Sequence, residues 1–408
     1  MGFSRIQLGV LALLGFGFVN IFLNWYPGNR LQFPTRRPGT TSGYNRSLSD
    51  SGKPRNVTLL NISPSFTSFI PVKTSFWNRR LHQALQRLSE LRAGGAVDFT
   101  PPRGCRPVGL EAEIANADSY SLPHRDFVRY MDCKDQRQLI DHRDKCVDSG
   151  HGVFLLLAIK SMAGNFERRQ AIRETWGMET AAAGSGSQIR TVFLLGSADD
   201  LGQGPDLQPL VNVEDQMHGD ILQWDFRDSL YNLTLKDHLF LGWASARCPL
   251  ARYVFKGDDD VFLNTPVVVE YLRSLNGSKE LYVGQMIKNA SPLRDTKSKY
   301  NVPLSFYDGA YPPYMGGAGF LYSGHLVPSL YAISHAIPFY PIDDVFTGMC
   351  FSALGISPIN HQGFHTFDIQ PQDRDNPCAH AGVLLVHQRG PSQTTRLWRA
   401  LRQPDLRC

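Results

Sequence analysis

Short apolar runs alternate with amphipathic segments from residue 153 onward. Val153–Met162 and Ile189–Gly196 are apolar almost throughout, which suits strands that are buried on both faces of a parallel sheet. Phe166–Gly177 has a helical pattern, and Asp220–Cys248 fits a short strand followed by a long helix. A further strand pattern covers Tyr253–Phe255. Strands that alternate with helices predict a doubly wound α/β sheet, in which ligands lie beyond the carboxyl ends of the strands.

The N-terminal segment contains one long apolar stretch, Ile6–Leu23, without a charged residue. As a helix rising ~1.5 Å per residue it would span roughly 27 Å, the thickness of a thin bilayer. A cleaved signal peptide would have a shorter apolar core and a small-residue exit. Trp25 and Tyr26 instead suit an interfacial aromatic belt. We therefore predict a cytoplasmic tail at residues 1–5 and an uncleaved transmembrane signal-anchor at residues 6–23.

The residues between the anchor and the sheet divide into two parts. Residues 24–75 are rich in Pro, Gly, Ser and Thr without a sustained apolar period, which is typical of a flexible stem. Ser75–Gly95 has apolar residues at helical spacing and ends at two glycines. Three cysteines lie between this helix and residue 150. We interpret residues 76–150 as a helical, disulfide-tied collar and residues 151–408 as the main domain.

Cysteines and glycosylation sequons indicate the compartment. All seven cysteines lie beyond the anchor and none forms a CxxC or Cys/His zinc pattern, so disulfides in an oxidising compartment are the expected use. The odd number leaves at least one thiol free or paired between chains. The sequons also lie beyond the anchor and begin at Asn45, Asn56, Asn61, Asn232, Asn276 and Asn289. Because the charges that flank the anchor do not decide its orientation, these features predict a type II membrane protein with a lumenal bulk.

Composition changes this picture little. The chain has 408 residues, of which 42% are hydrophobic and 19% charged, and its formal net charge is +5. This mild charge, without a Lys/Arg block interleaved with aromatic residues, does not favour nucleic-acid binding.

Three adjacent acids, Asp258, Asp259 and Asp260, follow the strand pattern Tyr253–Phe255. Successive strand residues face opposite ways, so Asp258 and Asp260 can share one side while Asp259 points elsewhere. A divalent cation or a ribose hydroxyl would relieve their repulsion. A polar loop or an Asx-type turn explains a bare triplet equally well. Its place at the end of a sheet strand favours a binding site.

A second acidic pair, Asp343 and Asp344, is wedged among apolar residues. One of two adjacent, half-buried carboxylates can hold a raised pKa and act as a base. Either aspartate could instead be the N-cap of the helix that follows. The two interpretations are compatible, because a capping aspartate can still present its carboxylate to a site.

Two further features are weak by themselves. Gly316 and Gly317 allow close backbone approach to a ligand, and Tyr311 and Tyr314 could stack on sugar faces. These glycines fit neither a dinucleotide fingerprint nor a Walker loop. His387 ends an apolar strand, where a structural histidine is the better interpretation unless the acidic triplet already places a metal. In that case imidazole, carboxylate and phosphate oxygens would suit Mn²⁺.

Seven segments together resemble one family. The β1,3-glycosyltransferases of the Golgi, and among them most closely the β1,3-N-acetylglucosaminyltransferases of the poly-N-acetyllactosamine synthase type, are similar to this chain from about residue 75 to its end. The family's terminal cysteine recurs as Cys408. The stem and the anchor resemble those of the family only in their general character. The segments are FLLLAIKS, RRQAIRETWG, FKGDDDVFLNT, YPPYMGGAGFLYSG, YPIDDVFTGMC, GFHTFDI and LLVHQR.

The resemblance implies a GT-A-type nucleotide-diphosphosugar transferase fold with a Rossmann-like central sheet at residues 151–408. It implies Mn²⁺ or Mg²⁺ at Asp260 and His387, and a catalytic base at Asp344. The residues that it places at the donor, UDP-GlcNAc, are Asp258, Asp259, Arg169, Arg173, Lys256, Gly316 and Gly317.

The implied reaction transfers GlcNAc to the 3-hydroxyl of a terminal galactose on glycoproteins or glycolipids, with inversion, at the Golgi membrane. This would extend poly-N-acetyllactosamine chains. A β1,3-galactosyltransferase of the same family would share every acid named above. A metal-dependent hydrolase would need a further acid, for which Asp343 is the obvious candidate. Intact Asp260, Asp344 and His387 argue against an inactive lectin or scaffold. A homodimer and a hetero-oligomer with other Golgi transferases both stay open.

Overall fold

The computed structural model describes residues 61–93, 107–109, 113–114, 116–147, 152–180, 188–198, 205–275 and 280–408. These residues fall in one structural unit, Asn56–Cys408. The predicted tail, the anchor and the stem as far as residue 60 lie outside the described residues. Within the described part, no helix combines the length and the apolar character that crossing a bilayer requires.

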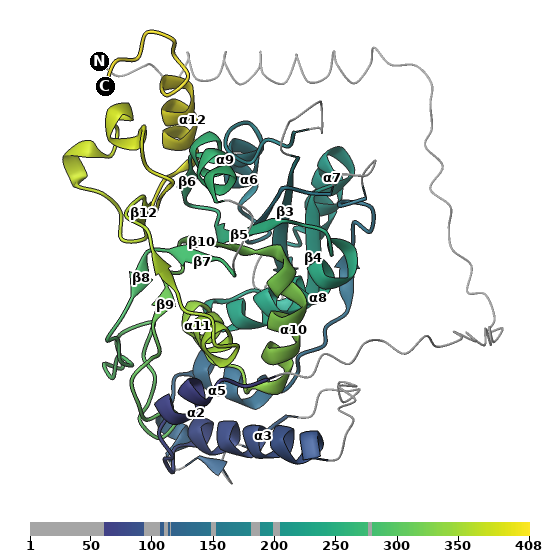
Figure 1. Cartoon of the computed structure of the whole chain (residues 1–408). Coiled ribbons are helices and arrows are strands. Elements are labelled where there is room, and N and C mark those ends of the chain that lie inside the picture. Colours follow the sequence, from purple (N-terminus) through teal and green to yellow (C-terminus); the bar gives the residue numbers. More distant parts are fainter. Residues whose placement is uncertain are drawn as a thin grey trace, which may run out of the picture. The chain divides into compact units, whose positions relative to one another are not determined.

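A central eight-stranded sheet confirms the predicted α/β architecture (Figure 1). Four neighbouring strands in it are parallel, and β10 and β7 add an antiparallel pair beside β5. In spatial order the strands are β1 (Gln138–Ile140), β4 (Ile221–Arg227), β3 (Ile189–Ser197), β2 (Leu155–Lys160), β5 (Tyr253–Asp258), β10 (Gly319–Ser323), β7 (Tyr282–Gly284) and β11 (Ile359–Asn360).

Ten α-helices belong to the described part of the chain. They are α2 (Pro64–Phe69), α3 (Phe76–Ala93), α5 (Leu122–Tyr130), α6 (Phe166–Arg173), α7 (Gln208–His218), α8 (Leu233–Arg247), α9 (Thr265–Ser274), α10 (Val327–Ala336), α11 (Asp343–Ala353) and α12 (Pro391–Ala400).

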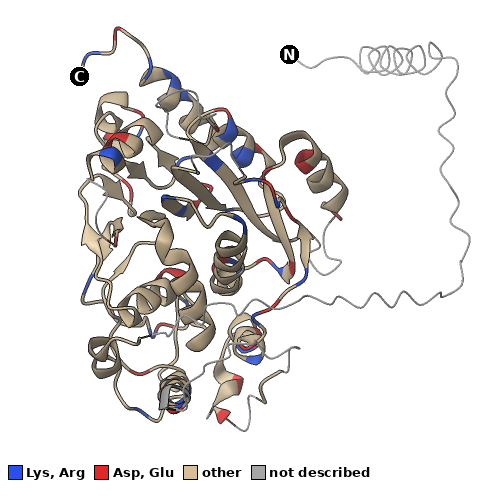
Figure 2. Ribbon diagram, turned by 45° about the vertical axis from the view of Figure 1, so that its right-hand side comes forward, with Lys and Arg blue, Asp and Glu red and all other residues tan. Residues whose placement is uncertain are grey.

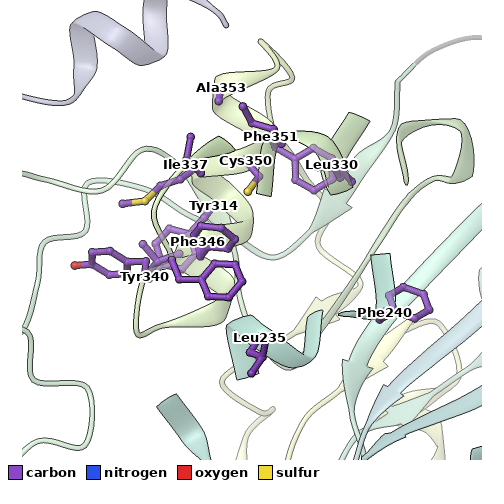
Figure 3. Close-up of a cluster of buried hydrophobic side chains, with 14 of the residues drawn as sticks. Leu235, Phe240, Tyr314, Leu330, Ile337, Tyr340, Phe346, Cys350, Phe351 and Ala353 are labelled. Atoms are coloured by element: carbon purple, nitrogen blue, oxygen red, sulfur yellow. The ribbon is translucent and has the colours of Figure 1, made fainter. Parts of the chain in front are cut away.

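The sheet separates two hydrophobic cores. On β2, Leu156 and Ala158 face one core while Leu155, Leu157 and Ile159 face the other, as the two-residue period of a strand requires. The first core contains residues of α2, α3, α5, α8, α10 and α11, and the second contains residues of α6, α7, α9 and α12. Figure 3 shows part of the first core around α11. Each face of the sheet is thus covered by helices, as in other doubly wound sheets.

Two small sheets bring distant segments to the end of β5. A three-stranded sheet joins β12 (Phe364–His365), β13 (Leu385–Val386) and β6 (Phe262–Leu263). Because β13 pairs antiparallel with β6, the residue after β13 lies near the residues that precede β6. A two-stranded sheet pairs β8 (Met286–Ile287) with β9 (Tyr314–Met315).

The N-terminal helices are part of the first core. The helix expected at 75–95 is α3, whose Trp77 and Leu81 are fully buried. Phe66 and Ile70 are buried as well, although they fall within the expected stem. The folded body therefore begins before residue 76, because α2 supplies core residues that the composition of the stem did not reveal.

Two disulfides stabilise the described part. Cys146 pairs with Cys248, and Cys378 pairs with the terminal Cys408. Cys133 is disulfide-bonded too. Cys350 is a free, buried thiol, which agrees with the odd number of cysteines.

Phe66→Ala should lower the free energy of unfolding by about 3–5 kcal/mol, since a fully buried phenylalanine is replaced by a cavity. Phe69→Ala is the matched control on the same helix, because Phe69 is 43% exposed, and it should cost less than about 1 kcal/mol. Chemical denaturation of the two variants measures the difference. Equal losses would show that α2 is not part of the core.

Candidate active site

The site lies at the carboxyl ends of β2 and β5. The parallel register of these strands places Lys160 directly opposite Asp258. A cavity of about 560 Å³ opens there. Its lining includes Lys160, Asp258, Asp343, Asp344 and His387. The two acidic motifs and the histidine that the sequence singled out therefore meet in one hollow, at the edge where sheets of this type bind ligands.

Asp258, Asp260 and His387 form a group that could hold a metal ion. One ligand atom from each lies within 4.8 Å of the other two, and all three residues are half-buried. His387 Nδ1 lies 2.9 Å from the Thr366 carbonyl, to which it donates, so Nε2 is directed toward the carboxylates. Two carboxylates and an imidazole are a suitable donor set for Mn²⁺.

Protonation of this group reflects the attraction between its members. Nε2 of His387 lies 3.2 Å from Oδ1 of Asp260. Burial opposes the charged form of His387, but the hydrogen bond and charge of Asp260 outweigh it and raise the histidine pKa. Burial likewise opposes ionisation of Asp260, and His387 and Arg168 outweigh it and lower that carboxyl pKa. Burial raises the pKa of Asp258 against the opposing charge of Lys160, so Asp260 is the carboxyl of the group that ionises most readily.

Asp259 points away from the other two acids, as the alternation of strand residues predicts. Its buried carboxylate accepts hydrogen bonds from Ser161 Oγ at 2.6 Å, Asn165 Nδ2 at 2.8 Å and Arg168 Nη1 at 3.1 Å. Three protein donors stabilise the charge. Asp259 therefore ties the end of β5 to the segment that follows β2.

Asp343 and Asp344 begin α11, but neither is its N-cap. The N-cap is Ile342, so that alternative is wrong, although both acids occupy the first turn where the helix dipole favours negative charge. Asp343 accepts from Lys160 at 2.7 Å and from Lys256 at 3.2 Å. Burial opposes ionisation of Asp343, but these two cations outweigh it and hold the pKa of Asp343 far below its usual range.

Asp344 differs from its neighbour. Its carboxylate lines the cavity, is half-buried and accepts from the Val345 amide at 2.8 Å. Burial and the adjacent charge of Asp343 raise the pKa of Asp344 to about 7, against the opposing effect of Lys160 and Lys256. Two neighbouring carboxyls with separated pKa values are typical of acid–base sites.

The glycines allow close packing at the cavity. A Cβ on Gly317 would lie 3.1 Å from Oδ2 of Asp344, and one on Gly316 would lie 2.5 Å from the Thr366 side chain. Tyr311 and Tyr314 line the cavity but are otherwise buried. Most of their ring area is therefore used in the core.

Two aromatic residues that the sequence analysis did not select are more accessible. Tyr300 is 41% and Phe367 70% exposed, and both line the cavity. Aromatic faces exposed at a cavity could stack on sugar rings. Nothing in the hydrophobic pattern distinguished them, because both lie in segments without regular periodicity.

Three cations that the resemblance places at the donor are paired with protein carboxylates and are not among the residues that line this cavity. Arg169 is fully buried and forms a bidentate pair with Glu214, and Arg173 pairs with Glu214 and Asp220. Lys256 is buried beneath the site against Asp237 and Asp343. Their assignment to the donor stays a prediction, although protein carboxylates already pair with all three charges.

Two other cations face the acidic groups instead. Lys160 lies 2.9 Å from Asp258, and Arg168 lies 3.1 Å from Asp259 and 3.4 Å from Asp260. Lys160 could have been selected from the sequence, because it is a charged residue at the end of an apolar strand. Figure 2 shows acidic and basic positions interspersed along the ribbon. The charges at the site are thus a local arrangement.

Comparison with known proteins identifies relatives. A family model described as Galactosyltransferase matches residues 167–362. Human N-acetyllactosaminide beta-1,3-N-acetylglucosaminyltransferase 2 is 48% identical over 82% of this chain and 86% of its own. Human acetylgalactosaminyl-O-glycosyl-glycoprotein beta-1,3-N-acetylglucosaminyltransferase is 42% identical over 72% of this chain and 78% of its own. A solved glycosyltransferase involved in glycosylation of the major capsid of PBCV-1 covers 59% of this chain and 98% of its own, with 11% identity and a TM-score of 0.29, which supports no conclusion.

Arg169→Met should lower the free energy of unfolding by about 1–3 kcal/mol, because Glu214 would lose both hydrogen bonds that Arg169 donates to its buried carboxylate and would keep only Arg173. Arg168→Met should cost about 1 kcal/mol or less, since Arg168 is partly exposed and its partner Asp259 keeps two other donors. Denaturant titration of both variants tests the assignment. A larger loss for Arg168→Met would contradict it.

Proposed function

The chain belongs to the galactosyltransferase family of glycosyltransferases, and from that premise we propose that it transfers GlcNAc from UDP-GlcNAc to the 3-hydroxyl of a terminal galactose. The product would be a β1,3 linkage that extends poly-N-acetyllactosamine. The two relatives named above are both β-1,3-N-acetylglucosaminyltransferases. Their shared donor and linkage support the proposal.

The observation that carries the proposal is a single cavity lined both by Asp344 and by Asp258 and His387, two members of the group that could hold a metal. A transferase of this kind must hold a diphosphate near a base that faces the acceptor. A group suited to a metal on one side and a carboxyl with a raised pKa on the other meet that requirement.

We propose that Asp258, Asp260 and His387 hold Mn²⁺ or Mg²⁺, whose charge stabilises the diphosphate of the departing UDP. This set adds Asp258 to the two ligands that the resemblance implied. Gly316 and Gly317 would let the donor sugar approach the backbone. An acidic group at the carboxyl end of β5 also supports a GT-A-type arrangement for residues 151–408.

Asp344 would accept the proton from the acceptor 3-hydroxyl as that oxygen attacks the anomeric carbon of the donor. The bond from this carbon to the UDP oxygen breaks, and attack from the opposite face inverts the configuration. One carboxylate base is sufficient, unlike the acid and base of a glycosidase. Lys160 and Lys256 keep Asp343 ionised, so the proton goes to Asp344.

The acceptor would lie against the wall of the cavity that carries Tyr300. Asp344 and Tyr300 both lie close enough to Tyr314 to contribute to its raised pKa. The two relatives share the donor in their names but differ in the acceptor. We expect galactose-terminated glycans of glycoproteins or glycolipids to bind here.

This proposal also includes a lumenal Golgi location and a type II topology. It includes the division into tail, anchor, stem, collar and catalytic domain. The Cys146–Cys248 and Cys378–Cys408 disulfides support an oxidising compartment. A homodimer or a hetero-oligomer with other Golgi transferases would be compatible with the anchor.

The decisive experiment incubates the full-length protein in detergent with Mn²⁺, N-acetyllactosamine and either UDP-GlcNAc or UDP-galactose. We expect GlcNAc transfer in a β1,3 linkage, identified by NMR of the product, and loss of transfer in EDTA. Transfer of galactose alone would make the protein a β1,3-galactosyltransferase. Absence of transfer from both donors would exclude the proposal.

Asp344→Asn should reduce kcat by about 10²–10⁴-fold, because the acceptor hydroxyl loses its base. Affinity for UDP in the presence of Mn²⁺ should change less than about twofold, since Asp344 is not in the group that could hold the metal. Steady-state kinetics and calorimetry measure the two effects. Asp405→Asn, which alters an exposed carboxylate, is the control. Wild-type kcat in Asp344→Asn would refute the base assignment.

The acid limb of the kcat profile should reflect the ionisation of Asp344. Because its pKa is raised to about 7 and the ionised form is active, kcat should fall as pH drops through 7. Asp343→Asn removes the neighbouring negative charge and frees Lys160 and Lys256 to favour ionised Asp344. The limb should therefore move to lower pH in this variant. A shift to higher pH, or none, would contradict the proposed coupling.

A further inference from the structure

The connection between α10 and α11, residues 337–342, leads directly into the acidic pair and is buried over most of its length. It contains Pro338 and Pro341, which have no amide hydrogen. Its carbonyl groups are removed from water and must find donors elsewhere. The origin of those donors shows which parts of the molecule position Asp344.

Lys134 supplies donors at the start of the connection. Its Nζ lies 2.8 Å from the Ser334 carbonyl, 3.0 Å from the His335 carbonyl and 2.7 Å from the Ile337 carbonyl. It also lies 4.4 Å from the centre of the Phe339 ring. In its charged form, Lys134 at the carboxyl end of α10 satisfies carbonyls that the helix leaves unpaired, while burial lowers its pKa to about 7.

Trp77 supplies the next donor. Its Nε1 is 3.2 Å from the Pro338 carbonyl and 3.0 Å from the Phe339 carbonyl, and its ring meets Tyr340 edge-on at 5.5 Å. The Trp77 amide donates to the Phe306 carbonyl at 2.7 Å, which fixes the start of α3 on the body. The indole is fully buried.

The last carbonyl of the series is satisfied from another helix. Thr234 Oγ1, on α8, donates to the Tyr340 carbonyl at 2.7 Å. Ile337, Tyr340 and Phe346 of α11 belong to the same hydrophobic core (Figure 3). Carbonyls 337–340 are thus all bonded to side chains from outside the connection. Lys134 and Trp77 provide three of these four contacts.

We infer that Trp77 and Lys134 are positioning residues for the transfer reaction, acting through residues 337–342 on Asp343 and Asp344. Both lie before residue 167, where the family match begins. The inference rests on the proposed role of Asp344 as the base. A displacement of 1 Å in a reacting group can reduce the rate by about 10²-fold. Trp77 and Lys134 would then control kcat from outside the cavity.

The test compares Trp77→Phe with Trp176→Phe in the full-length protein. Trp77→Phe removes both carbonyl contacts but keeps an aromatic ring. Trp176 is an equally buried tryptophan whose Nε1 has no partner in the structure. We expect kcat to fall about tenfold or more in Trp77→Phe and less than twofold in Trp176→Phe. KM for UDP-GlcNAc should stay within twofold in both.

Two readouts separate positioning from loss of stability. Water entering beside a loosened connection should move the acid limb of kcat to lower pH in Trp77→Phe only. The groups that face Asp344 are unchanged in both variants; they are Asp343, Lys160, Lys256, Tyr282, Tyr311 and Tyr314. Hydrogen exchange at the amides of Val345 and Phe346 should also increase in Trp77→Phe alone, and this measurement requires no activity.

Lys134 provides an independent pair of variants. Lys134→Met should reproduce the loss of kcat, and Lys134→Arg should restore part of it by donating to the same carbonyls. If Trp77→Phe and Lys134→Met keep wild-type kcat, acid limb and exchange rates, the inference is overturned. The inference is also overturned if these two variants lose no more kcat than a Trp176→Phe variant that has the same free energy of unfolding. Wild-type protein without transfer activity would refute the proposed function, while the exchange measurement would still decide the structural claim.

Discussion

One buried ammonium group joins the two acidic motifs of this protein. Lys160 Nζ lies 2.9 Å from Asp258 and 2.7 Å from Asp343, which come from parts of the chain 85 residues apart by direct count. Without this cation their carboxylates would repel each other in a poorly solvated place. The contact follows from the register of β2 against β5, which sets Lys160 opposite Asp258. Strand register therefore determines the geometry of the site.

The same register explains why two neighbouring carboxyls behave differently. Lys256 lies two residues before Asp258 and faces the same side of the sheet, where it meets Asp343. Asp343 is thus neutralised by two cations, while Asp344 is left with burial and a negative neighbour. The difference in pKa arises from the position of strand lysines under the first turn of α11. It requires no special property of either aspartate.

Local periodicity accounts for what the sequence predicted well. Apolar runs located β2, β3 and β5, and the alternation of strand residues separated Asp259 from its neighbours. Cation partners were harder to foresee. Arg168 and Arg169 are adjacent on α6, so their side chains diverge by about 100°, and only one can face the acidic triplet. Which one does so depends on how α6 packs on the sheet, and the local pattern of the sequence does not reveal that packing.

The N-terminal helices α2 and α3 show the other limit of local reasoning. A proline-rich segment before residue 76 is typical of a stem, and its pattern gives no reason to connect it with residues 337–342. The connection needs donors because it is buried and has proline at two positions. Trp77 meets that need across 262 residues of sequence. The connection that leads into α11 and the first helices bury each other's side chains, so removal of either should disturb the other.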